Sequence, residues 1–327
     1  MSEEHQDEEK VIERRNLFLK QCDEIYQKWL TSPASGYLDN LSEDRARFIA
    51  ILLDTQRLFN ETNDYPDWNK FSLDLVRNIY EDFVGFHLVS MQPFISPNGF
   101  MYAKEFKMDS DAEEFKINLR LCEYDAASKT KKLKTQVNAA WGEMDADLYR
   151  EIQDETAREI LTDLRNNAGT IMTKDFEPTS WEEIYLRIVE MSGIIHRKTL
   201  RGGCNWIATS SELGDIICEE CHLERPPKTM SPKFVGTVHG VWKLIIDPLF
   251  PKNQILCGRQ EELAPAYIYS PYLVVTPTPV VLDPEFFNPR RGLLTRYAKK
   301  LMRTGAKWYG RISFGVKPAE PIIDYNI

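Results

Sequence analysis

The 327-residue chain lacks any apolar run near the ~18–20 residues that a membrane-spanning helix needs. Its first ten residues are acidic and lack the apolar core of a secretory signal, so we expect no export. The 41 Lys and Arg residues against 50 Asp and Glu give a formal net charge of -9. That is not the basic excess of a protein whose whole surface wraps nucleic acid, although a local basic patch is still allowed.

Cysteine is scarce and irregularly spaced in a chain too long to need disulfide staples. We therefore expect free thiols, made in a reducing cytoplasm. The six positions are Cys22, Cys122, Cys204, Cys218, Cys221 and Cys257.

Sequence motifs of the common enzyme classes are absent as well. The chain has no G-x-G-x-x-G, no Walker A loop, no H-E-x-x-H, no G-x-S-x-G and no EF-hand loop. Its five histidines are scattered without the spacing of a ligand set. These absences favour an interaction or structural role over catalysis, and we predict that the chain is not an enzyme and binds no cofactor or metal.

One segment does match a known signature, because Cys218–His222 spells C-x-x-C-H, the haem c attachment sequence. The segment lies on a predicted amphipathic helix whose apolar face includes Leu213 and Ile217, and its cysteines continue that face. We favour buried thiols that act as small hydrophobic side chains. One alternative is a zinc site completed by Cys204. The other is a covalent haem, although haem attachment requires export and no export is expected.

Three charge clusters have two interpretations each. An acidic cluster is either a calcium site or a solvated hairpin flank. A basic run and a basic tract are each either a binding patch or a solvated face. As a patch, each would bind an acidic partner or nucleic acid. The acidic cluster is Asp109, Asp111, Glu113 and Glu114; the basic run is Lys129, Lys131, Lys132 and Lys134; the tract is Arg290, Arg291, Arg296, Lys299, Lys300, Arg303, Lys307 and Arg311.

The order of predicted elements favours an α+β fold, because helices and strands alternate without regular βαβ units. Residues 108–140 contain no Gly or Pro, which favours a long extended hairpin. Frequent prolines after Pro227 indicate that most later strands are not central throughout. Helices are predicted over 8–30, 42–59, 69–83, 144–167, 180–200 and 211–222. Strands are predicted over 87–91, 100–107, 117–124, 204–209, 234–238, 242–246, 254–257, 266–269, 273–275 and 280–282.

Ordered sequence blocks run through residues 87–314. They lie at 130–134, 157–161, 205–206, 210–212, 235–237, 242–243, 247–248, 254–258, 266–272 and, as the most specific, 283–297 from Asp283-Pro284 to Tyr297. In this order they resemble the major capsid proteins of T-even-like tailed bacteriophages, which have the Hong Kong 97-type capsid fold. Residues 1–85 resemble no family that we can name.

The resemblance implies four parts, expected as an N-terminal helical arm at 1–85, an E-loop region at 86–142, a peripheral domain with a long spine helix at 143–185 and 276–327, and an axial domain at 186–275. It also implies a virion protein, assembled in the host cytoplasm, that forms hexamers and pentamers of an icosahedral or prolate head. An encapsulin-type compartment shell or a vertex paralogue of the major capsid protein is the alternative.

Expected partners are further copies of the chain, portal, scaffold and decoration or vertex proteins, and packaged DNA on the inner face without sequence specificity. No membrane partner is expected. The resemblance places the basic run on the returning side of the E-loop, over the adjacent subunit, where acidic groups such as Asp145, Asp147 and Glu151 are candidate partners. The inter-subunit contact candidates are Lys129, Lys131, Lys132, Lys134, Arg290, Arg291 and Arg296.

Overall fold

The computed structural model describes residues 3–63, 66–109, 116–138, 148–174, 180–225, 233–261, 265–279, 281–282 and 289–315. The chain divides into two compact units. Unit 1 comprises Met1–Phe83, Val89–Thr156 and Glu262–Met302, and unit 2 comprises Val84–Leu88, Ala157–Glu261 and Arg303–Ile327. No helix among the described residues is long and apolar enough to cross a membrane.

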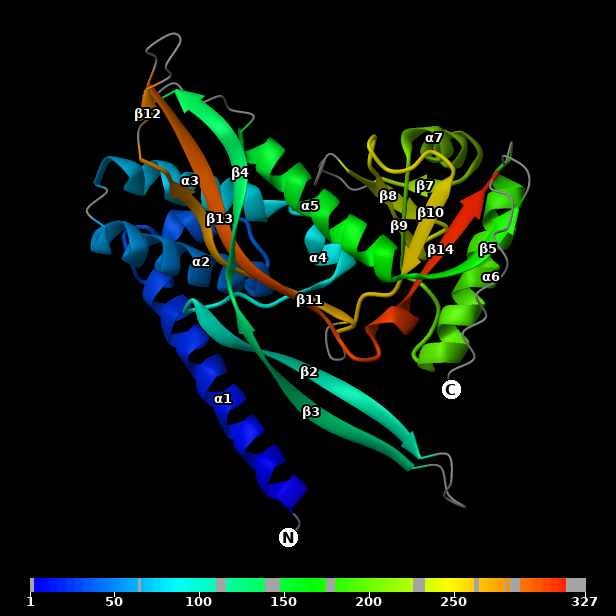
Figure 1. Ribbon diagram of the computed structural model, residues 1–327, viewed down its shortest axis with the longest axis horizontal. Coiled ribbons are helices and arrows are strands. Elements are labelled where there is room, and N and C mark those ends of the chain that lie inside the picture. The colour runs from blue at the N-terminus through cyan, green and yellow to red at the C-terminus, as the bar shows by residue number, and fades with distance from the viewer. Residues whose placement is uncertain are drawn as a thin grey trace. The chain divides into compact units, whose positions relative to one another are not determined.

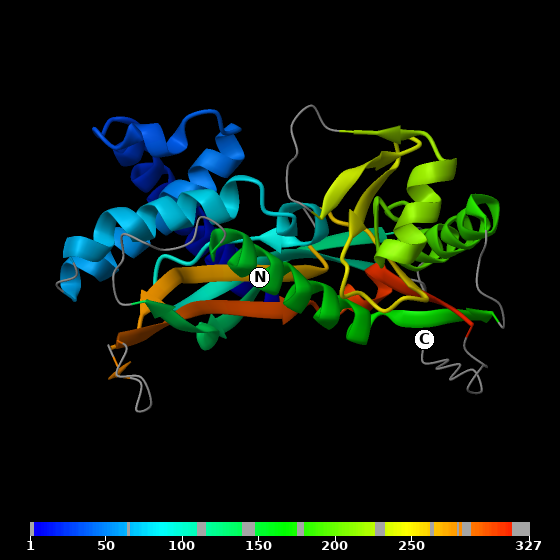
Figure 2. The same ribbon diagram turned by 90° about the horizontal axis from the view of Figure 1, so that it is seen from above.

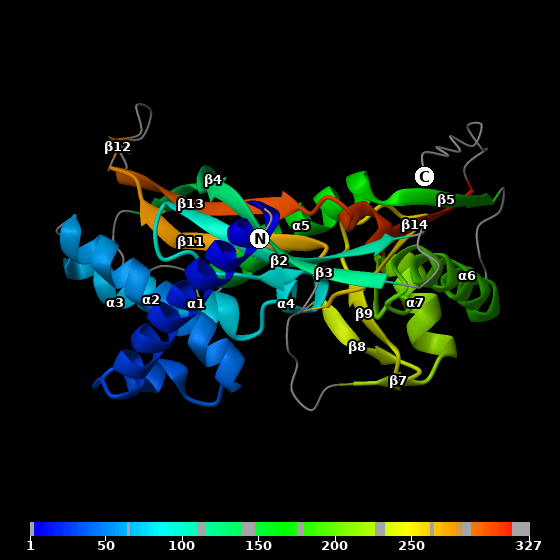
Figure 3. The same cartoon turned by 90° about the horizontal axis from the view of Figure 1, so that it is seen from below.

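Unit 1 begins with helices α1 (Glu3–Leu30), α2 (Glu43–Thr62) and α3 (Pro66–Glu81), with the short helix η1 (Ser35–Leu38) after α1. Side chains at helical spacing on α1, namely Cys22, Tyr26 and Trp29, are buried. In Figures 1 and 3, the C-terminal half of α1 lies against α2, while its N-terminal end lies away from α2. Because almost every side chain from Phe48 to Gln56 is buried, α2 is the central helix of this unit.

The main sheet of unit 1 runs in the order β1-β11-β13-β12, with β4 pairing on β13. Helices α2 and α3 pack on β11 and cover one face of this sheet (Figure 2). Its strands are β1 (Ser90–Met91), β4 (Lys129–Asn138), β11 (Tyr267–Pro277), β12 (Val281–Leu282) and β13 (Pro289–Leu301).

A long antiparallel hairpin is the second sheet of unit 1. It pairs β2 (Asn98–Asp109) with β3 (Lys116–Ala127) over their whole lengths. Met101 and Ala103 at its base share a hydrophobic cluster with Ile268 of β11 and Ala298 of β13. Neighbouring residues of a strand face opposite sides of a sheet. The hairpin base packs on one face of the five-stranded sheet, and α2 and α3 cover the other face.

Helix α5 (Leu148–Asn167) belongs to unit 1 up to Thr156 and to unit 2 from Ala157. Its buried apolar residues recur at helical spacing, as the sequence predicts. They are Ile152, Ala157, Ile160, Leu161 and Leu164.

Unit 2 is built on a seven-stranded sheet in the order β5-β14-β10-β6-β9-β8-β7. Side chains of α6 and α7, including Ile188 and Ile217, share one hydrophobic cluster with Ile207, Leu244 and Ile255 of the sheet. The strands are β5 (Gly169–Lys174), β6 (Trp206–Thr209), β7 (Leu223–Glu224), β8 (Phe234–Val238), β9 (Trp242–Ile246), β10 (Gln254–Gly258) and β14 (Tyr309–Phe314). The helices are α4 (Gly85–Leu88), α6 (Trp181–Thr199), α7 (Ser211–Glu220) and η3 (Gly305–Trp308).

Three local predictions were wrong. The predicted strand at 87–91 is the end of α4 followed by the two-residue β1. The basic run is not in the extended hairpin, because β4 pairs with β13 and not with β2. The sequence also showed no strand at Pro289–Leu301, where β13 is the longest strand of the described chain.

Proline did not exclude a central strand either. β11 lies between β1 and β13 and contains Pro271. The pairing with β13 shifts between Pro271 and Leu273, and an irregularity of this kind is where a strand tolerates a residue without an N–H donor. The four-part division of the chain stays a prediction, since the two units neither match nor exclude it.

Candidate assembly surface

The basic residues predicted as contacts lie in two strands that pair with each other. β4 and β13 are antiparallel, with Lys129 opposite Tyr297 and Arg290 opposite Asn138. The structure thus brings together two charged segments that are far apart in the sequence. The predicted contacts are Lys129, Lys131, Lys132 and Lys134 in β4, and Arg290, Arg291 and Arg296 in β13.

We call β4 and β13 together the basic ribbon. β13 also carries Lys299 and Lys300, so the ribbon contains nine Lys or Arg residues. No Asp or Glu occurs in any described strand of the five-stranded sheet. In a chain of net charge -9, this arrangement concentrates positive charge on one sheet and suits a negatively charged partner.

Aromatic rings hold part of the ribbon in place. The guanidinium of Arg296 lies 5.6 Å from the centre of the Tyr272 ring, and the ammonium of Lys300 lies 4.6 Å from that of Tyr124. Such cation–π contacts bury the side-chain stem and leave the charge near the surface. Lys129, which lies opposite Tyr297 near the same end of the pairing, is exposed. The ribbon is therefore anchored at its β13 side and open to solvent at Lys129.

Helix α1 is joined to the base of the hairpin. The Nε of Arg14 donates to both carboxylate oxygens of Glu123, at 3.0 and 2.9 Å. Phe18 packs beside Tyr102, with ring centres 6.1 Å apart. Burial, with a further contribution from Glu123, raises the pKa of Tyr102 to about 12, so this hydroxyl stays protonated at neutral pH. These contacts fix the direction of α1 relative to the hairpin.

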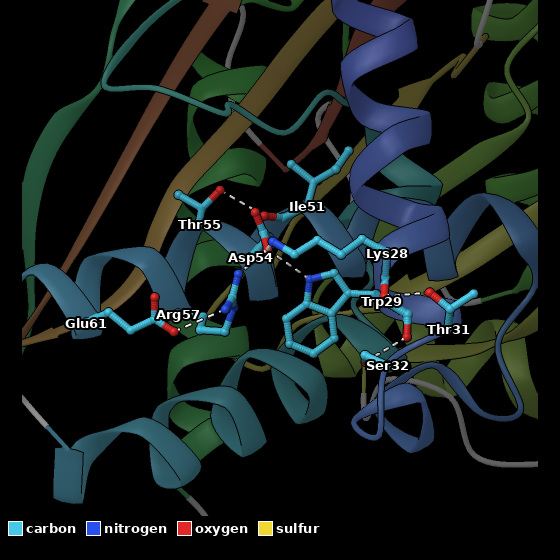
Figure 4. Close-up of polar contacts among 9 residues, drawn as sticks. All are labelled: Lys28, Trp29, Thr31, Ser32, Ile51, Asp54, Thr55, Arg57 and Glu61. Atoms are coloured by element: carbon cyan, nitrogen blue, oxygen red, sulfur yellow. Dashed lines mark hydrogen bonds and ion pairs between the residues drawn. The ribbon is translucent and has the colours of Figure 1, made fainter.

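A buried carboxylate ties the other end of α1 to α2 (Figure 4). One oxygen of Asp54, Oδ1, accepts hydrogen bonds from Lys28 Nζ at 3.0 Å, Trp29 Nε1 at 3.2 Å and Arg57 Nη2 at 3.0 Å. Burial alone would raise the pKa of Asp54, but the hydrogen bonds from Lys28 and Arg57 outweigh it and hold the pKa below its ordinary value.

Two buried glutamines attach helices to the rest of unit 1. The side chain of Gln56 donates to the carbonyl of Val275 at 2.8 Å and accepts from its N–H at 3.4 Å, so α2 is bonded to β11. Gln153 of α5 donates to the carbonyl of Ile79 at 2.6 Å. Sequence reasoning missed these contacts and the Asp54 cluster, because nothing in the local sequence marks a polar residue as buried.

The C-x-x-C-H segment lies at the end of α7. Cys218 and Cys221 pack partly against the core of unit 2, as predicted, but His222 is exposed. Burial raises the pKa of Cys221 to about 11. Cys204, the proposed third zinc ligand, instead hydrogen-bonds Cys257. Among the described residues, no three His, Cys, Asp or Glu side chains lie close enough together to hold a metal ion.

The predicted acidic groups are mostly outside the described residues. Asp111, Glu113 and Glu114 of the candidate calcium cluster, and Asp145 and Asp147 before α5, are among these. Glu151 is exposed in the first turn of α5.

A family model described as "Major capsid protein Gp23" matches residues 133–308, which is more than half of the chain. The chain belongs to the Gp23 family of major capsid proteins. The prediction of a major capsid protein, a structural component of the virion, is confirmed. The match covers all of β13 and β4 from residue 133, so Lys134 and the β13 residues of the basic ribbon lie within it, whereas Lys129, Lys131 and Lys132 precede it.

The expected α+β fold of the Hong Kong 97 type is confirmed, with N-terminal helices, a long hairpin and the long helix α5. The encapsulin-type and vertex alternatives are not favoured.

Solved structures give distant likenesses. The virus-like particle from Pyrococcus furiosus is 9% identical, with a TM-score of 0.45, over 75% of this chain and 98% of that chain. A Microbacterium phage Oxtober96 structure is 9% identical, with a TM-score of 0.45, over 71% and 91%. The capsid of Myoviridae phage XM1 is 7% identical, with a TM-score of 0.41, over 71% and 92%. No curated protein matches the sequence.

Proposed function

We propose that the chain assembles into hexameric and pentameric capsomers of an icosahedral or prolate head, with the basic ribbon at the boundary between subunits. The observation that carries this proposal is the pairing of β4 with β13, which gathers the predicted contact residues on one sheet. Capsid proteins of this family self-assemble, and an interface needs a surface that is complementary to another part of the same chain.

The hairpin supports the same conclusion. β2 and β3 pair with each other along twelve residues, and the described packing of the hairpin on the sheet involves its base. A two-stranded hairpin in water is at best marginally stable alone, because half of its backbone groups face solvent. A neighbouring subunit under or beside the hairpin would stabilise it.

Other partners follow from the head that the capsomers would form. We expect portal, scaffold and decoration or vertex proteins to contact the shell, and packaged DNA to face it without sequence-specific contacts. In this proposal the chain has no catalytic role, and the four-part arrangement of arm, E-loop region, peripheral domain and axial domain applies as expected from the sequence.

The test is a quadruple Lys→Glu variant at positions 129, 131, 132 and 134. Each exposed pair is worth only about 0–1 kcal/mol, but the contact recurs around every ring, so four reversals turn several attractions into repulsions at each interface. We expect the variant to fold, by circular dichroism, but to remain as monomers or loose capsomers at low salt in negative-stain images. Normal shells from this variant would contradict a boundary role for β4.

A further inference from the structure

The start of α1 has a charge opposite to that of the basic ribbon. Residues 3–9 contain five Asp or Glu residues and no Lys or Arg. By their spacing, Glu4, Asp7 and Glu8 share one face of the helix. The positive end of the helix dipole favours acidic residues there, but like charges three and four residues apart repel each other. An external positive surface would remove that repulsion.

The main packing of α1 is on elements other than the basic ribbon. α1 packs on α2, η1 and β3, and the salt bridge from Arg14 to Glu123 belongs to the last of these contacts. Before Arg14, the described side chains of Glu9, Lys10 and Ile12 are exposed. In Figure 1, the first turns of α1 lie away from β4 and β13 of the same unit.

The basic ribbon offers the complementary surface. Its nine basic residues lie in paired strands, on a sheet whose described strands contain no acidic residue. β4 is an edge strand in the described sheet, pairing there with β13 alone. A helix can therefore approach the ribbon from the β4 side without displacing another strand.

We propose that residues 3–10 of α1 dock on the basic ribbon of a second copy of the chain. This inference rests on the proposed function and names the partner of its surface. The acidic and basic surfaces are different parts of the molecule, so the contact is heterologous, and heterologous contacts that close form rings. Each copy supplies one of each surface, so every site in a ring is filled.

The balance of charge also favours a second copy of the chain over nucleic acid as the partner of the basic ribbon. Duplex DNA would neutralise the same lysines and arginines. It would repel the acidic turns of α1. Docking of α1 neutralises both surfaces with a single contact.

The experiment is a charge swap with four chains. The helix variant carries Glu4→Lys, Asp7→Lys and Glu8→Lys, and the ribbon variant carries Lys131→Glu, Lys132→Glu and Lys134→Glu. The combined variant carries all six changes. The matched control is Asp215→Lys, Glu219→Lys and Glu224→Lys, three exposed residues of unit 2. Assembly is followed by sedimentation velocity and negative-stain microscopy at low and high ionic strength, and folding by circular dichroism.

We expect the helix and ribbon variants each to need at least about tenfold more protein to assemble at low salt, and the combined variant and the control to assemble normally. An equimolar mixture of the helix and ribbon variants should assemble, because Lys on one copy then meets Glu on the next. High salt should weaken wild-type assembly, since exposed charges are screened. A neutral variant, Glu4→Gln with Asp7→Asn and Glu8→Gln, should show a smaller defect in the same direction, even if the helix variant folds poorly.

Other outcomes separate the two proposals. A wild-type chain that never assembles contradicts the proposed function. Wild-type assembly combined with normal assembly of the helix and neutral variants contradicts the α1 contact alone. Rescue in the combined chain but not in the mixture would show a contact within one chain and overturn the inference. A ribbon variant that loses only copurified nucleic acid, beside a normally assembling helix variant, would assign the ribbon to nucleic acid.

Discussion

The two larger sheets of this chain differ in where their charges and their buried residues lie. The seven-stranded sheet of unit 2 has short strands whose side chains join α6 and α7 in one hydrophobic cluster. The five-stranded sheet of unit 1 is covered by α2 and α3 on one face and by the hairpin base on the other, yet its β4 edge carries concentrated positive charge. Unit 2 is organised around its own core, whereas the sheet of unit 1 also carries an edge strand rich in lysine.

This difference predicts that substitutions act on different quantities in the two units. Changes in the sheet of unit 2 should lower the free energy of unfolding, because packing is what its strands contribute. Changes in the basic ribbon should leave folding almost intact and alter assembly, because exposed charges add little to stability. On the isolated subunit, the expected losses of stability decrease from Trp206 to Arg14.

The largest effect is expected at Trp206, at the centre of the unit 2 sheet. Its side chain is 0% exposed, on a strand between β10 and β9. A Cβ on Gly258 would lie 2.0 Å from the Trp206 ring, so the ring fills its site completely. We expect Trp206→Ala to cost about 3–5 kcal/mol of unfolding free energy. Urea denaturation of unassembled subunits measures this, with faster hydrogen exchange in β6 and β10.

The matched control is Leu249→Ala, since Leu249 is also in unit 2 but is 67% exposed. It should change the unfolding free energy by less than about 0.5 kcal/mol. Equal losses at the two positions would show that burial in this sheet does not determine the stability of unit 2.

The next effect compares a fully buried salt bridge of unit 2 with a half-exposed one of unit 1. In unit 2, Lys233 and Asp247 lie 3.3 Å apart with side chains 4% and 2% exposed. In unit 1, Lys28 and Asp54 lie 3.0 Å apart, but Lys28 is 55% exposed. Lys233→Ala leaves the buried carboxylate of Asp247 without its nearer cation, with Arg158 still at 4.0 Å, and should cost about 3 kcal/mol. Lys28→Ala should cost about 0–1 kcal/mol, because Arg57 still bonds Asp54.

Thermal denaturation of the two alanine variants at neutral pH tests this order. Lys233→Met provides a further control, since it keeps the packing volume while removing the charge. A cost at Lys28 equal to that at Lys233 would contradict the idea that burial of both partners sets the penalty.

Local signals in the sequence located much of unit 2. The capping position Ser180 and the acidic first turn predicted a helix at 180–200, and α6 is Trp181–Thr199. Alternating apolar residues predicted strands at 234–238 and 242–246, which are β8 and β9. These elements were found because their signals lie within a few residues.

The candidate surface was harder to predict. β13 contains Arg and Lys between its apolar residues, so its sequence favoured a charged tract over a strand. Its pairing with β4 depends on residues far apart in the chain, and no local pattern reports that register. The resemblance supplied the family and the candidate residues, but it placed the basic run in the hairpin, and only the strand register corrected this.

A third effect concerns pH in unit 1. The pKa of Asp54 is held below its ordinary value of 3.8, so its contacts stabilise the fold fully above that pH. The contribution is lost as pH falls through the lowered pKa, where the carboxylate of the folded state is protonated. Asp54→Asn should therefore cost about 2 kcal/mol at neutral pH and progressively less in acid. Urea denaturation at neutral and acidic pH measures the difference between the two chains.

Asp39→Asn is the control, because Asp39 is exposed and lies in the same unit. It should change stability little at any pH. A difference between wild type and Asp54→Asn that grows in acid would contradict the lowered pKa of Asp54.

The smallest effect is expected at Arg14, where the two regions of unit 1, helix and hairpin, are joined. Arg14 is 49% exposed, whereas its partner Glu123 is 7% exposed. Arg14→Ala should cost about 1 kcal/mol, because a nearly buried carboxylate loses its hydrogen bonds from Arg14. Arg14→Lys should recover part of this cost, since an ammonium replaces the charge but not the two-pronged geometry. Hydrogen exchange should rise in the first half of α1 and leave α2 unchanged, whereas Lys20→Ala, an exposed change on the same helix, should alter neither. If Arg14→Ala leaves exchange in α1 unchanged, the salt bridge does not set the direction of the helix, and α1 would have to be oriented by its contacts with α2 and by Phe18 on Tyr102.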